Sequence, residues 1–88
     1  MKIKVFVLTH TYRTSDNNTD TNVEFVASTI TRAKAELAKH RELIVGEYDE
    51  KFPDDNEVYE NHPTYWGITS KSEEVWDELQ ITEKEVGQ

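Results

Sequence analysis

The chain has 88 residues, no cysteine and a net charge of −8, with 35% hydrophobic and 32% charged residues. This length predicts a single domain, residues 1–88, whose core is one layer thick. The lack of cysteine excludes disulfides, thiolate nucleophiles and cysteine-bound metals, and the acidity disfavours direct binding to nucleic acid or to anionic membranes.

The first predicted element is a strand over residues 2–12, because Ile3, Val5 and Val7 alternate with residues of the opposite face. Leu8 is one of those residues, and apolar side chains on both faces are typical of a central strand. The apolar run is too short for a signal peptide or a membrane span, so we expect a cytoplasmic protein.

A polar hairpin loop is predicted next, because residues 14–22 contain no apolar side chain and are rich in Asn, Asp and Thr. Within it, Asp16, Asn18 and Asp20 have the 1-3-5 spacing of a calcium-binding loop. The pattern then fails, since Thr21 stands where such a loop needs glycine. We therefore expect ordinary turn chemistry, followed by a short antiparallel strand over 23–27.

The strongest helix signal begins at Ser28 or Thr29, either of which can cap the helix N-terminus. Ala33 and Leu37 lie on one predicted helix face, and most residues between them are strong helix formers. Gly46 is a natural residue to follow the last helical turn, so the helix is predicted to end at residue 45.

The second half predicts a packed, acidic, irregular segment over 47–63, with a short strand or turn near 57–60. A strand over 65–69 and a turn over 70–74 follow. The order β-β-α-loop-β-β then predicts an α+β fold, with a mainly antiparallel sheet and one helix packed on one face.

The segment 72–79 fits two structures. A capping-box pattern and the spacing of Val75, Trp76 and Leu79 favour a helix, whereas the alternation of Leu79 and Ile81 with polar residues favours a strand. We expect a turn, with room for one helical turn, and then a strand across 77–86.

The strand that carries Val5, Val7, Leu8, His10 and Tyr12, followed by a helix that opens Ser-Thr-x-x-x-Ala, supports a family resemblance. This part of the chain, about residues 3–40, resembles small uncharacterised bacterial and phage ββαβ proteins with a V-x-V-L-x-H-x-Y strand and an S-T-x-x-x-A helix. The resemblance implies the fold and no particular activity.

No catalytic or cofactor-binding motif is present. His10, His40 and His62 are far apart and lack the spacing of metal ligands. The sequence has no nucleophile elbow, and its three glycines form no phosphate-binding loop. We therefore expect no cofactor and no metal, and the sequence favours binding over catalysis.

The negative charge is concentrated in residues 47–88, which hold three lysines and thirteen acidic residues. Aromatic residues are interspersed among these acids, as protein interfaces favour. We expect an acidic protein-binding module with a basic protein partner, in its sharpest form a phage-type inhibitor that mimics nucleic acid. This expectation depends on the acids forming one patch beside exposed rings. The predicted partner-binding residues are Tyr48, Asp49, Glu50, Phe52, Asp54, Asp55, Glu57, Tyr59, Glu60, Glu73, Glu74, Trp76 and Asp77.

Two other functions remain open. The first is a domain that binds a nucleotide or another small molecule, or a small enzyme, with a pocket between sheet and loop. His10, Tyr12 and Arg13 would be its polar groups, and Arg13 could hold an anion. The second is a structural homodimer.

Overall fold

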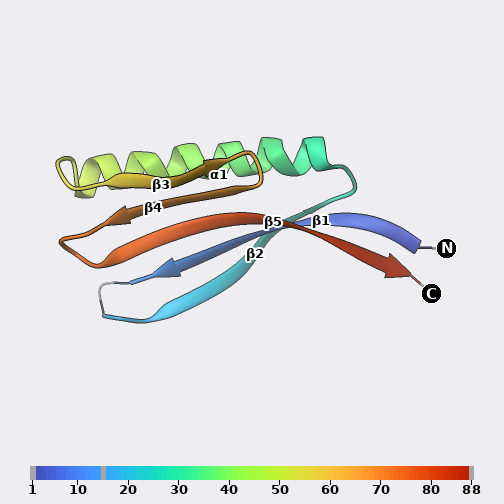
Figure 1. Ribbon diagram of the computed structural model, residues 1–88, viewed down its shortest axis with the longest axis horizontal. Coiled ribbons are helices and arrows are strands. Elements are labelled where there is room, and N and C mark those ends of the chain that lie inside the picture. Colours follow the sequence, from blue (N-terminus) through green and yellow to red (C-terminus); the bar gives the residue numbers. More distant parts are fainter. Residues whose placement is uncertain (1, 15, 88) are drawn as a thin grey trace.

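The computed structural model describes residues 2–14 and 16–87 and contains one helix packed on one face of a five-stranded antiparallel sheet (Figure 1). The strand order is β2-β1-β5-β4-β3. The predicted α+β class is therefore confirmed. The elements are β1 (Lys2–Arg13), β2 (Thr19–Ala27), α1 (Ile30–Lys51), β3 (Glu57–His62), β4 (Tyr65–Ser70) and β5 (Val75–Gly87).

The core lies between α1 and the sheet face that it covers. Leu8 is opposite Ile81 on β5, and Trp66 on β4 is opposite Leu79, so the three central strands present apolar side chains to the helix. Within the described part of the chain, the other sheet face, here called the open face, has no helix over it. The buried hydrophobic residues are Leu8, Ala27, Ala33, Leu37, Ile44, Tyr48, Trp66, Ile68, Leu79 and Ile81.

Helix α1 begins as predicted but continues past its predicted end. The Thr29 side chain accepts a hydrogen bond from the Arg32 N–H and is the N-cap. The expectation that Gly46 follows the helix is wrong, because residues 47–51 are helical. A glycine inside a helix costs only about 1 kcal/mol. Packing of Tyr48 in the core, where it is 4% exposed, outweighs that cost.

Two strands are also longer than predicted. Residues 19–22, expected in a loop, belong to β2 and pair with the end of β1, so only a short turn joins these strands. Strand β5 begins at Val75, so the ambiguous segment 72–79 is a turn and then a strand. It pairs with β1 through twelve residues, from Lys2 opposite Gly87 to Arg13 opposite Trp76. Among the described residues, no helix has the length and apolar character needed to cross a membrane.

On the open face, the Tyr59 ring lies over Gly67 of β4. A Cβ atom at Gly67 would be 2.6 Å from Cζ of Tyr59, closer than real contacts allow. An irregularity in the β3–β4 register between Val58 and Glu60 accompanies this placement, and the Tyr59 hydroxyl donates to Glu78 on β5. Strand β3 is therefore tied to β5 across Gly67, whose lack of a side chain leaves room for the ring.

Replacement of the two glycines should have opposite effects on stability. Gly67→Ala must displace the Tyr59 ring and break its hydrogen bond, and we expect it to lower the free energy of unfolding by about 1 kcal/mol. Gly46→Ala, which meets no atom within 4 Å on an exposed helix position, should raise it by about 0.5–1 kcal/mol. Urea unfolding of both variants measures the difference. Equal effects would contradict the described packing of Tyr59.

Candidate functional site

A pocket of about 340 Å³ opens between the C-terminal end of α1 and the strands β1 and β5. It lies at the end of the molecule where the turn between β1 and β2, the turn between β4 and β5, and the last turn of α1 come together (Figure 1). Its volume is at the lower end of the range for ligand sites. The lining residues are Tyr12, Arg13, Thr14, Glu47, Tyr48, Lys51, Phe52, Glu73, Val75 and Asp77.

The Asp77 carboxylate is held between two donors at this pocket. The Tyr48 hydroxyl donates to Oδ1 at 2.7 Å, and Nε2 of His10 lies 2.6 Å from Oδ2. Since a carboxylate only accepts, His10 donates through Nε2. The side chains of His10 and Asp77 are 18% and 20% exposed. Charge-assisted bonds this short fix the direction of the carboxylate without removing its charge.

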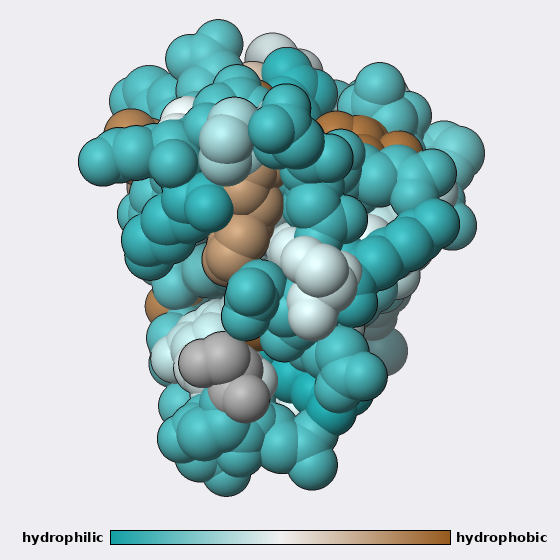
Figure 2. All heavy atoms as spheres, turned by 90° about the vertical axis from the view of Figure 1, so that its left-hand side faces the viewer, coloured by the Kyte–Doolittle hydropathy of each residue, from teal (hydrophilic) through white to brown (hydrophobic). Residues whose placement is uncertain are grey.

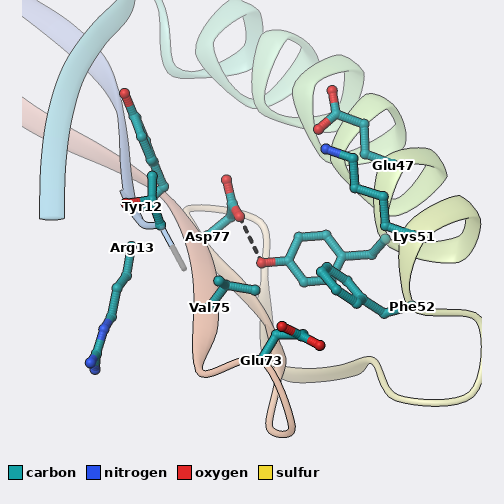
Figure 3. Close-up of a pocket in the computed structure, with 10 residues that line it drawn as sticks. Tyr12, Arg13, Glu47, Lys51, Phe52, Glu73, Val75 and Asp77 are labelled. Carbon is teal, nitrogen blue, oxygen red and sulfur yellow. Dashed lines mark hydrogen bonds between the residues drawn. The ribbon is translucent and has the colours of Figure 1, made fainter. Parts of the chain in front are cut away.

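Aromatic rings stand on both sides of Asp77. Tyr12 comes from β1, and its ring centroid is 5.1 Å from that of His10. Tyr48 and Phe52 come from the other side, with their centroids 5.6 Å apart. Figure 3 shows Tyr12 and Phe52 on opposite sides of the pocket, with Asp77 between them. Two aromatic walls around a carboxylate form a surface that attracts cations.

The pocket is negatively charged. Glu47 and Glu73 line it together with Asp77, while Lys51 supplies a positive charge one helical turn after Glu47. Figure 3 shows Glu47 and Lys51 extending to the same side of α1. Arg13 also borders the pocket, but its side chain extends away from Tyr48 and donates to Asn17 in the adjacent turn. The structure thus gives Arg13 a partner in the turn and does not direct it at an anion in the pocket.

A second polar cluster supports His10 from behind. The register between β1 and β2 shifts between Leu8 and Thr9, which leaves Glu24 as an extra residue on β2. Its Oε1 lies 3.9 Å from Nδ1 of His10, and its Oε2 lies 3.6 Å from Nε2 of His40 on α1. The bulge therefore places one carboxylate between two histidines of different elements, on the side of the His10 ring opposite Asp77.

The thirteen predicted partner-binding residues fall into separate groups. Four of them, Tyr48, Phe52, Glu73 and Asp77, line the pocket. Asp49, Glu50, Asp54 and Glu74 are exposed in α1 and in the loops at the same end of the molecule. Figure 2 views this end and shows mostly hydrophilic residues around a narrow strip of less polar ones. The structure therefore brings about half of the predicted surface together.

The other predicted residues lie elsewhere or are engaged within the fold. Asp55 accepts hydrogen bonds from the hydroxyl and N–H of Ser72 and from the Ser70 hydroxyl, which lower the pKa of its carboxyl and fasten the turn between β4 and β5. Tyr59 lies on the open face, because its ring is over Gly67. Trp76 lies on the same face, since it is opposite Arg13 on β1. The remaining two, Glu57 and Glu60, pair with Lys71 and His62, each at 3.0 Å.

The remaining acidic residues of the second half include a pair at the opposite end of the molecule. Glu83 and Glu85 of β5 lie 3.8 and 3.6 Å from Lys4 and Lys2 of β1. Within each of these exposed pairs, the positive charge of the lysine offsets the negative charge of the glutamate. The negatively charged surface is therefore concentrated at the pocket end of the molecule and does not reach its opposite end.

No group of three or more His, Asp or Glu side chains within residues 2–14 and 16–87 is arranged to hold a metal ion. The pocket itself presents the Asp77 carboxylate, aromatic rings and the charged side chains of Glu47, Lys51 and Glu73. Comparison of the chain with protein-family models, with curated proteins and with solved structures finds no match.

Removing the charge of Asp77 should destabilise the fold. In Asp77→Asn one of the two donors, Tyr48 or His10, meets an amide group instead of a carboxylate oxygen, and we expect a loss of about 1–3 kcal/mol in the free energy of unfolding. Asp54→Asn, which makes the same charge change at an exposed loop position, should stay within about 0.5 kcal/mol of the unmodified chain. Urea unfolding at pH 7 compares them; similar losses would contradict the role of Asp77.

Stability should fall in alkali because of Tyr48. Burial, and then its hydrogen bond to Asp77, raise the pKa of the Tyr48 phenol above its usual 10.0. The unfolded chain therefore loses this proton first, and the stabilisation is lost as pH rises beyond about 10, at up to ~1.4 kcal/mol per pH unit. Unfolding followed between pH 9 and 12 should show a shallower decline in Tyr48→Phe. An unchanged slope would contradict this cause.

Proposed function

We propose that the protein is a small acidic binding module that holds a basic segment of a partner protein, with one lysine or arginine side chain inserted into the pocket. The observation that carries the proposal is the Asp77 carboxylate, fixed by Tyr48 and His10 between two aromatic walls. A cation placed there gains a charge partner and the faces of Tyr12 and Phe52.

The surroundings of the pocket support a segment of polypeptide as the ligand. Glu47 and Glu73 line the pocket, and exposed acids of α1 and the adjoining loops lie at the same end. Several negative charges around one anchoring site steer a basic chain toward it and increase its association rate. A protein whose own ligand is nucleic acid carries such a basic surface, so inhibition by mimicry is the sharpest form of this proposal.

A second candidate function follows from the His10–Asp77 pair. A histidine oriented by a carboxylate beside a pocket is an arrangement used for proton transfer, and a small cationic metabolite could occupy the same space. In that case the pocket alone would determine affinity, and the surrounding acids would matter little. A thermal-shift screen with amines and nucleosides distinguishes this candidate from the first.

A basic peptide should bind at the pocket end. We expect an acetylated and amidated hexapeptide of alternating lysine and glycine to shift the backbone NMR signals of Tyr12, Phe52 and Val75, with weak affinity that is lost in 0.5 M NaCl. Glu73→Gln should weaken binding several-fold. Glu83→Gln, the same charge change at the far end, should leave it unchanged.

The same peptide with glutamate in place of lysine provides the negative control and should cause no shift. Equal responses to both peptides would overturn the proposal. So would shifts from the lysine peptide that are confined to residues distant from the pocket.

A further inference from the structure

Apolar side chains gather on the open face at the end of the molecule away from the pocket. On β1, alternate residues Ile3, Val5 and Val7 share this face, and Val7 is opposite Val26 of β2 while Ile3 is opposite Val86 of β5. Three of them, Ile3, Val26 and Val86, are 56%, 54% and 55% exposed. We call these five residues, Ile3, Val5, Val7, Val26 and Val86, the terminal patch.

The strands that carry the terminal patch lack the neighbours that the rest of the sheet has. Strand β2 pairs with β1 only from Phe6 onward, and β4 pairs with β5 only up to Gln80. Lys2 through Val5 and the last residues of β5 therefore form a two-stranded ribbon, and Figure 1 shows this ribbon extending beyond the start of α1. Two paired strands without a covering layer are marginally stable in water.

Charge at this end differs from charge over the rest of the molecule. The ribbon carries Lys2, Lys4 and Lys84 against Glu83 and Glu85, although the chain as a whole has a net charge of −8. Lys84 is opposite Val5 and lies at the free edge of β5, where its ammonium group can remain in water at the rim of the patch. This is consequently a surface where a second strongly acidic molecule can approach without repulsion.

We propose that two copies of the chain associate through their terminal patches, open face against open face, about a two-fold axis perpendicular to the strands, so that the two pocket ends point in opposite directions. Each ribbon then gains the covering layer that it lacks, and the apolar side chains leave water. The molecule measures 50 × 24 × 16 Å, with the pocket at the opposite end, so this association keeps the two acidic ends far apart. Their separation exceeds the screening distance of about 8 Å at physiological salt.

This second-copy association and the proposed partner binding respond oppositely to salt. Partner binding joins unlike charges and weakens as ionic strength increases, whereas self-association joins two acidic molecules and should strengthen. The two proposals use opposite ends of the molecule, so either can fail without the other. The pocket of each copy should therefore remain accessible to a partner in the dimer.

Sedimentation equilibrium of the full chain between 10 µM and 1 mM tests the association. Because the contact is small, we expect a dimer with a dissociation constant of micromolar order, which decreases when NaCl is raised from 50 to 500 mM. Val26→Lys should increase that constant at least ten-fold. Because Val26 is exposed on the edge strand β2, we expect the variant to fold, and circular dichroism checks this.

Leu43→Lys is the matched control, since Leu43 is 70% exposed but lies on α1. It should leave the dissociation constant unchanged, and Val86→Lys should act like Val26→Lys. A chain that stays monomeric at 1 mM in both salt concentrations would overturn the proposal. An equal effect of Leu43→Lys and Val26→Lys would overturn it as well, because association would then not depend on the terminal patch.

Discussion

A single helix has to cover a sheet that is larger than the helix in both directions. Its 22 residues span about 33 Å and its diameter is about 10 Å, whereas the twelve residue pairs of β1 and β5 extend over about 40 Å and five strands are about 19 Å wide. The helix consequently covers only part of one face and leaves the end that carries the two termini uncovered (Figure 1). Polar groups such as His10, Glu24 and Asp77 occupy the space beside the helix, and the pocket lies against its last turns. The uncovered ribbon lies beyond its N-terminal end.

The ends of the molecule differ in chemistry because the chain distributes its charges unevenly. At the pocket end, three loops and the last helical turn bring acidic residues together around aromatic rings. At the other end, lysines of β1 pair with glutamates of β5 and leave an apolar surface. A protein with one charged end and one apolar end can bind two different kinds of surface at the same time. That division is the structural basis on which partner binding and self-association are proposed as separate roles.

Local sequence patterns predicted most of the fold, and tertiary pairing determined the rest. Alternation identified β1, and the pair Ser28 and Thr29 marked the start of α1. The continuation of the helix past Gly46 depends on Tyr48 meeting the core, and the polar start of β2 is a strand only because β1 offers it hydrogen bonds. For the site, the sequence indicated that aromatics and acids belong together, but not that Tyr48 and Asp77 bond to each other across 29 residues. The sequence did contain a signal for the position of His10 and Tyr12. They follow Leu8 at every second residue of β1, so their side chains lie on the same sheet face as Leu8, the face that the helix covers.

The sheet is organised around its first and last strands. The two strands in contact at its centre, β1 and β5, come from opposite ends of the described chain, and their outermost pair joins Lys2 to Gly87. The hairpin of β1 with β2 and the meander of β3, β4 and β5 close over short loops, but their union requires the pairing of β1 with β5, whose residues are distant in sequence. Such high contact order slows folding, because the entropy of loop closure is lost before the core is gained. During synthesis, β1 has only one neighbour until β5 has been made, and its apolar residues remain open to aggregation for that time.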